Sequence, residues 1–135
     1  MRKNLFRNIW HFANQLAVLR REIDIQNDRL GTQVKIWVGG DGKNVTIPEA
    51  VRHADGWSGF GPPTEFANKA KHVAENNLEI SVLLTPNDLA NDLQAYVDAG
   101  ADQVIRSLRP SEENTFDLAP IAQMLSERAQ LIGSL

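Results

Sequence analysis

The stretch that decides the fold is residues 35–57, KIWVGGDGKNVTIPEAVRHADGW. A short apolar run stops on a pair of glycines, and a segment with a helix-opening signal follows. Thr46 and Glu49 have the spacing of a capping box, which predicts a helix from 46 to about 54. An Asp-Gly pair then breaks that helix before the next apolar run begins. The stretch therefore predicts a strand, a helix and a second strand in succession.

The same alternation continues along the chain. Apolar runs predict four short strands, at 34–38, 57–60, 79–84 and 103–105. Helical spacing predicts helices at 46–54, at 66–77, after Thr85, and near 118–129. A long amphipathic helix is expected before them, over about 4–25, with 26–33 as a connector.

Strands that alternate with helices indicate parallel pairing through right-handed crossovers. The expected fold class is therefore α/β, with about four parallel strands alternating with helices, plus an N-terminal helix. No low-complexity linker interrupts the sequence, so a single domain is expected over 1–135, in which 1–33 form the N-terminal helix and connector.

The amino-acid composition argues against several classes of function. The formal net charge of −3 and the lack of any long basic block argue against nucleic acid as the main partner. The absence of cysteine excludes disulfides and thiolate metal sites, and three scattered histidines predict no metal centre. Polar residues interrupt the first apolar positions, so neither a signal peptide nor a membrane span is expected. A cytoplasmic location is the resulting expectation.

Three glycines after the first strand form the first candidate site. Gly39, Gly40 and Gly42 lack side chains, so the backbone there can approach a ligand closely. The helix expected at Thr46 would point free amides and its positive dipole end toward the same place. This arrangement favours an anion, although the carboxylate of Asp41 would repel a phosphate. A tight turn that needs positive φ explains the same glycines.

Two residues after the second strand form a second candidate. The ends of adjacent parallel strands share one rim, so Ser58 and Gly59 are expected to converge on the same anion. A loop leading into the following prolines is the alternative. Asp55 lies at a helix-to-strand corner, where a structural role is expected, with hydrogen bonds from the backbone or from Arg52. Asp102 occupies the equivalent corner, and no residue is predicted to be catalytic.

Several of these segments together resemble a known family. The strand KIWVGG, the helix ending AVRHADGW and the stretch TPNDLANDLQAYVDAGADQVI resemble the C-terminal part of luciferase-like monooxygenases. These are flavin- or deazaflavin-dependent oxidoreductases built on an eightfold β/α barrel. The resemblance covers about 34–125 and implies a partial TIM-type barrel, because such a barrel needs about 250 residues.

The resemblance also implies a cofactor, FMN or a deazaflavin coenzyme. The residues that would contact its phosphate end are Gly39, Gly40, Gly42, Ser58 and Gly59. The flavin performs its own redox chemistry in such enzymes, so a missing acid–base set does not contradict the family.

Two further possibilities remain open. The first is a non-catalytic half-barrel module that forms a homodimer or binds a complementary barrel half, because open strand edges and an uncovered apolar face invite association. The second is another β/α family with a phosphate ligand and no redox role. Comparing flavin binding with binding of plain phosphate separates this family from the flavin-dependent oxidoreductase, and light scattering tests the module.

Overall fold

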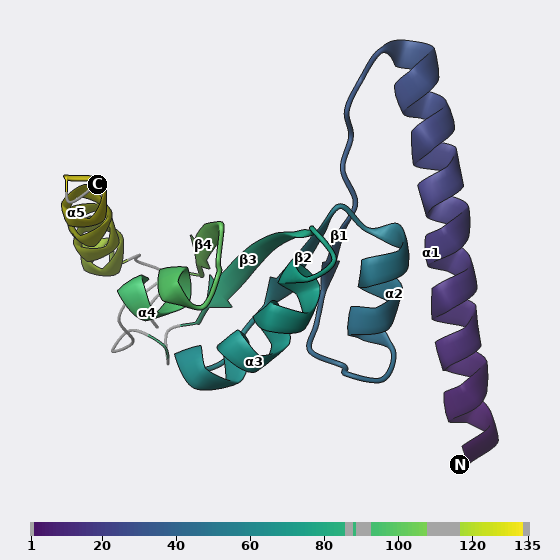
Figure 1. The fold of residues 1–135 in the computed structure, drawn as a ribbon, viewed down its shortest axis with the longest axis horizontal. Helices are drawn as coiled ribbons and strands as arrows, with labels where there is room; N and C mark the ends of the chain where they lie inside the picture. The colour runs from purple at the N-terminus through teal and green to yellow at the C-terminus, as the bar shows by residue number, and fades with distance from the viewer. Residues whose placement is uncertain (1, 86–87, 89–92, 108–116, 134–135) are drawn as a thin grey trace.

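The computed structural model describes residues 2–85, 88, 93–107 and 117–133. Four strands form one sheet: β1 (Trp37–Gly39), β2 (Gly56–Gly59), β3 (Glu79–Leu84) and β4 (Gln103–Arg106). They lie in the order β1-β2-β3-β4, and every neighbouring pair is parallel (Figure 1). The predicted α/β class, with four parallel strands alternating with helices, is therefore confirmed.

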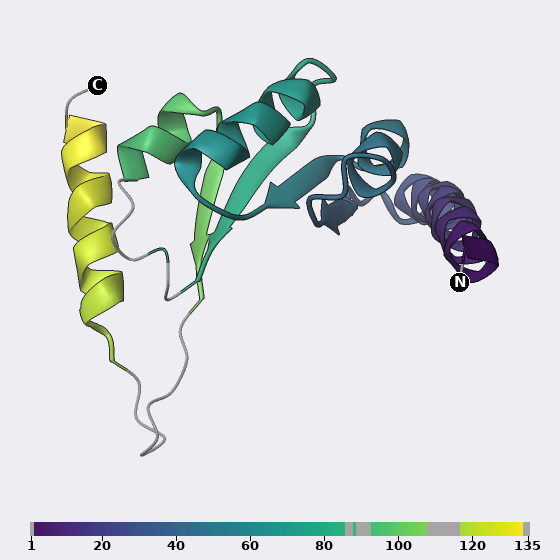
Figure 2. The same cartoon turned by 90° about the horizontal axis from the view of Figure 1, so that it is seen from below.

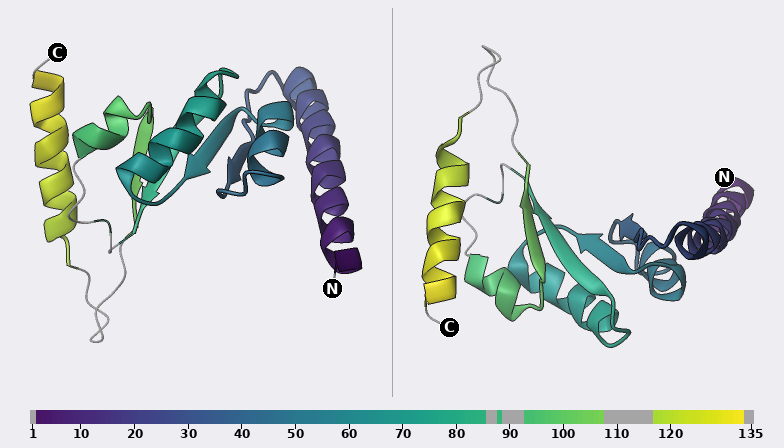
Figure 3. Two further views of the ribbon diagram at one scale, coloured as in Figure 1. Left: turned by 60° about the horizontal axis from the view of Figure 1, so that its bottom comes forward. Right: turned by 90° about the horizontal axis from the view of Figure 1, so that it is seen from above.

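Three helices cover one face of this sheet. They are α2 (Thr46–His53), α3 (Pro63–Ala74) and α4 (Leu93–Asp98), and Figure 2 shows them on the same side of the strands. A further helix, α5 (Ala119–Gly133), lies beside α4 beyond the β4 edge. In the described part of the chain the opposite face carries no helix (Figure 3). No described helix combines the length and apolar character that a bilayer crossing requires.

The core lies between the sheet and these helices. Trp57, on β2, is fully buried and stacks on Phe66 of α3 with ring centroids 5.7 Å apart. The ring of Phe66 also meets Tyr96 of α4 edge-on. On β3, Val82 points into this core whereas Leu83 is 37% exposed on the other face. Successive side chains of a strand point to opposite faces of the sheet, so one face packs against the helices and the other carries no described helix.

The N-terminal helix is longer than expected. α1 spans Arg2–Leu30, so the predicted end near 25 and the connector at 26–33 are wrong. No helix breaker precedes Gly31, which has φ +64° and ends the helix, while the amide of Thr32 donates to the carbonyl of Asn27. α1 runs beside α2 and continues beyond both its ends (Figure 1).

The start of α2 also differs from expectation. The N-cap is Val45, and no side chain caps the helix, so the capping box predicted at Thr46 is wrong. The preceding turn supplies the cap instead, because the carbonyl of Gly42 accepts hydrogen bonds from the amides of Val45 and Ile47. The stretch 85–88, TPND, also has the sequence pattern of a helix cap, with Thr85 as N-cap. The amide of Thr85 donates to the carboxylate of Asp88, whereas residues 86 and 87 lie outside the described residues.

Two helix-to-strand corners share one arrangement. Asp55 donates its amide to the carbonyl of Ile36, and its carboxylate accepts the amide of Ile36 at 2.8 Å. Asp102 forms the same reciprocal pair with Ile80, also at 2.8 Å. The structural role expected for both aspartates is therefore confirmed.

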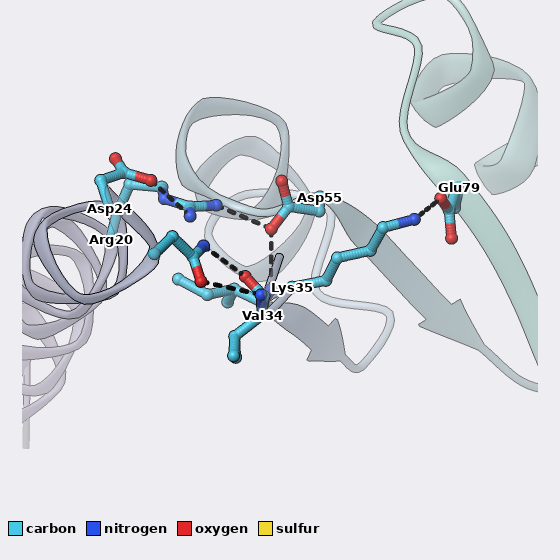
Figure 4. Close-up of polar contacts among 8 residues, drawn as sticks. Arg20, Asp24, Val34, Lys35, Asp55 and Glu79 are labelled. Atoms are coloured by element: carbon cyan, nitrogen blue, oxygen red, sulfur yellow. Dashed lines mark hydrogen bonds and ion pairs between the residues drawn. The ribbon is translucent and has the colours of Figure 1, made fainter. Parts of the chain in front are cut away.

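The arginine that pairs with Asp55 is not the expected one. Arg20 of α1 reaches its carboxylate at 2.7 Å, as Figure 4 shows, whereas Arg52 pairs with Glu49 on its own helix. Burial of Asp55 raises its pKa, but the bonds from the Ile36 amide and from Arg20 outweigh burial and leave the pKa lowered. Asp55 therefore connects α1, through Arg20, to the backbone of Ile36 just before β1.

Candidate functional site

The residues expected to converge do lie together at one edge of the sheet. Gly39 pairs in register with Ser58, and the amide of Gly40 donates to the carbonyl of Ser58 at 3.1 Å. Gly59 is the last residue of β2, and Gly42 belongs to the turn that enters α2. The carboxyl ends of β1 and β2 thus present all five candidates at a single rim.

Two of these glycines are required by the packing of one indole ring. A Cβ at Gly59 would lie 2.2 Å from the ring of Trp57, which no real side chain permits. Gly40 has φ +125°, and its carbonyl accepts the indole N–H of Trp57 at 2.7 Å. The fold therefore accounts for Gly40 and Gly59 without any ligand.

The other two glycines differ from each other. A Cβ at Gly42 would lie 2.7 Å from the hydroxyl of Thr46, so this position also serves the turn. A Cβ at Gly39 would meet nothing within 4 Å, and Gly39 is exposed. Gly39 is thus the candidate glycine beside which the structure leaves open space.

The N-terminus of α2 offers fewer amides than a free helix end. The amide of Ile47 is already bonded to the carbonyl of Gly42 at 3.0 Å. Pro48, the next residue, has no N–H. The expected contribution of this helix to an anion site is therefore reduced, and positive charge must come from side chains.

A lysine that the sequence pattern did not single out supplies such a charge. Lys69 of α3 donates to the carboxylate of Asp41 at 2.9 Å, and its ammonium lies 5.7 Å from the ring centroid of Phe60. Its side chain is only 11% exposed. The hydrogen bond from Lys69 holds the pKa of Asp41 below its ordinary value. The repulsion expected between Asp41 and a phosphate is therefore largely compensated.

Helical spacing is the one signal in the sequence that bears on this lysine. Phe66, Ala70 and Val73 form the buried face of α3, and Lys69 is adjacent to that face. The spacing places Lys69 at the edge of the buried helix face. It does not show that the hydrogen-bond partner of Lys69 is Asp41, which is 28 positions away in the sequence.

Open cavities flank the rim on both sides. One, of about 510 Å³, lies between α1 and the end of β1, where Phe12 faces Gly39 and Gly42. The other, of about 420 Å³, lies toward α3 and is lined by Asp41, Lys43, Glu65, Asn68 and Lys69. A third cavity, of about 400 Å³, lies between α4, β4 and α5 and contains none of the candidate residues.

A row of small and polar side chains crosses the open face of the sheet. Gly39, Ser58, Ser81 and Gln103 stand in register on the four strands. The hydroxyl of Ser81 is buried and has no hydrogen-bond partner within the described ranges. The row starts at the rim, and Ser81 is only 1% exposed, so the centre of this face is closed to solvent although no described helix covers it.

Comparisons with known proteins leave the family open. No protein-family model matches the chain, and no curated protein matches it significantly. Within the ranges that the structure describes, no three histidine, aspartate or glutamate side chains gather as metal ligands would.

Proposed function

We propose that this chain is part of a β/α barrel that binds the phosphate end of FMN or a deazaflavin coenzyme, as the resemblance to luciferase-like oxidoreductases implies. The single observation that carries the proposal is the joint ending of β1 and β2. There an open glycine, Gly39, lies in register with Ser58, and Lys69 of α3 donates a hydrogen bond to Asp41, two residues beyond Gly39.

The topology supports the barrel part of the proposal. Strands adjacent in sequence are adjacent in the sheet, and the intervening helices α2, α3 and α4 cover one face. A β/α barrel has this winding, with its ligands at the carboxyl ends of the strands. The four strands are half of the eight that a closed barrel needs.

The chain's own residues would bind and orient the cofactor. A bound flavin supplies hydride or oxygen chemistry by itself. The exposed backbone at Gly39 permits close approach of a phosphate, the hydroxyl of Ser58 offers a donor, and Lys69 offers positive charge. No residue of the chain is assigned an acid–base role.

Titration of the 135-residue chain with FMN, a deazaflavin and riboflavin tests the proposal. Flavin fluorescence and calorimetry are expected to show binding of the phosphorylated flavins, with riboflavin weaker. Gly39→Val is expected to weaken FMN binding, whereas Gly133→Val, at another uncrowded glycine, is the matched control. No FMN binding at high micromolar concentration would contradict the proposal.

A second candidate function, a self-associating half-barrel module, is favoured by the uncovered face of the sheet. Leu83 is 37% exposed and Ile105 is 46% exposed on neighbouring strands of that face. The strands β1 and β4 also end the sheet with unpaired edges among the described residues. Both features favour association with a second copy or with a complementary barrel half.

Light scattering tests this candidate. A dimer at tens of micromolar is expected, and Leu83→Lys is expected to dissociate it. Leu125→Lys is the matched control, because Leu125 is a similarly exposed leucine on α5. A monomer throughout this concentration range would exclude the module as described.

A further inference from the structure

We propose that Lys69 binds the phosphate group of a ligand at the joint end of β1 and β2, and that Asp41 holds this lysine until the ligand displaces it. The inference rests on the proposed function. It adds to that function a specific cation, Lys69, and a carboxylate, Asp41, that competes with the phosphate for this cation. Neither residue was among the five candidates that the sequence suggested.

The position of Lys69 is the first argument. Asp41, its hydrogen-bond partner, follows the last residue of β1 by two positions, and Phe60, whose ring lies near the ammonium, directly follows β2. A side chain from α3 thus places its charge next to residues that follow the ends of β1 and β2. A ligand in the cavity that Asp41 and Lys69 line comes within reach of this ammonium.

The bonding capacity of the ammonium is the second argument. A lysine has three N–H donors and no acceptor. Among the residues that the structure describes, Asp41 is the one hydrogen-bond acceptor of Lys69. A phosphate monoester offers three oxygens and up to two negative charges, so it satisfies more donors than one carboxylate does.

The surroundings give such a ligand room and a second cation. The cavity of about 420 Å³ beside Lys69 is also lined by the exposed Lys43, by Asn68, and by two carboxylates, Asp41 and Glu65. The side chain of Lys69 is 11% exposed whereas that of Asp41 is 44% exposed. When a phosphate arrives, the carboxylate can therefore turn into water while the lysine stays in place.

Exchange of partners predicts opposite effects for the two members of the pair. Removal of Asp41 frees the lysine and removes a negative charge near the ligand, so phosphate binding should strengthen. Removal of the charge of Lys69 takes away a charge-assisted hydrogen bond, so phosphate binding should weaken. A purely structural ion pair would give losses of similar size in both variants, because either change would disturb the same loop.

The experiment measures affinities for FMN and riboflavin in four variants of the full chain. Lys69→Met is expected to weaken FMN binding at least about tenfold, and Asp41→Asn to strengthen it about threefold or more. Lys69→Arg should retain most of the affinity. Lys71→Met, at an exposed lysine of the same helix, is the control and should change nothing. Riboflavin binding should be the same in all of them.

Inorganic phosphate separates failure of this inference from failure of the proposed function. Backbone amide NMR shifts of 39–42 are followed during a phosphate titration. If phosphate shifts these amides in the wild type but not in Lys69→Met, while FMN binds no better than riboflavin, the lysine assignment stands and the flavin proposal fails.

Three results would overturn the inference. The first is an unchanged phosphate and FMN affinity in a natively folded Lys69→Met, as judged by circular dichroism. The second is weaker binding in Asp41→Asn. The third is no response to either ligand in both the wild type and Asp41→Asn at low millimolar phosphate.

Discussion

Replacement of Asp55 by alanine tests the corner that joins α1 to the sheet. The change removes the acceptor of the buried Ile36 amide, and an unsatisfied buried amide costs about 1–3 kcal/mol. Arg20 keeps its other partner, Asp24, at 2.6 Å, so loss of the partly exposed ion pair adds only about 0–1 kcal/mol. The expected loss in free energy of unfolding is therefore about 1–4 kcal/mol.

Two further variants divide this loss into its parts. Asp55→Asn keeps an acceptor oxygen but removes the charge, so a loss of about 1 kcal/mol is expected. Asp102→Ala is the matched control, because it removes the same kind of amide acceptor at a corner with no arginine partner among the described residues. Urea unfolding followed by tryptophan fluorescence measures each difference at pH 7.

The pH dependence has a defined sign. The folded pKa of Asp55 lies below its ordinary value of 3.8, so its contribution is fully present above that value. It is lost as the pH falls through the folded pKa. The stability difference between the wild type and Asp55→Asn should therefore shrink below about pH 4. A loss under about 0.5 kcal/mol in Asp55→Ala at pH 7, or a difference from Asp55→Asn that grows in acid, would refute the reasoning.

Five other substitutions have clear expected outcomes in the same unfolding assay. Gly59→Ala should cost at least about 1–3 kcal/mol, because its Cβ would overlap an indole ring, whereas Gly39→Ala should be nearly neutral; equal losses would contradict the packing. Leu16→Ala should cost about 2–4 kcal/mol because this leucine is 7% exposed, and Trp10→Ala should cost little because the tryptophan is 71% exposed. Tyr96→Phe should cost about 1 kcal/mol by losing a 2.9 Å hydrogen bond, and no change would argue against that bond.

The arrangement of the sheet could be predicted because its signals are local. The run at 79–84 forms a strand with those bounds, as its apolar residues predict. Gly100, which follows α4, has a positive φ of 92°, as glycine often does at a helix end. The predicted first strand, 34–38, begins and ends too early, because β1 spans Trp37–Gly39. The amide and carbonyl of Ile36 bond to Asp55 at the corner, which precedes the regular strand.

The candidate site could be predicted only in part, because its decisive contacts join distant residues. The local sequence pattern predicts that Gly39 and Ser58 lie at the same edge of the sheet, and the parallel pairing of β1 with β2 places them there in register. It could not show that Trp57 lies across Gly59, or that Lys69 neutralises Asp41. Such contacts depend on the packing of α3 against the strands, which no short motif encodes.

The two aspartate corners divide the sheet into units. Asp55 fixes β2 to the segment before β1, and Asp102 fixes β4 to the first half of β3. The corresponding position before β3 is Leu78, which has no side-chain oxygen and is buried. The repeating unit is therefore a pair of strands with one aspartate between them, present twice in this chain. Each pair, β1 with β2 and β3 with β4, thus has its own side-chain bond from corner to neighbouring strand, whereas Leu78 supplies none between β2 and β3.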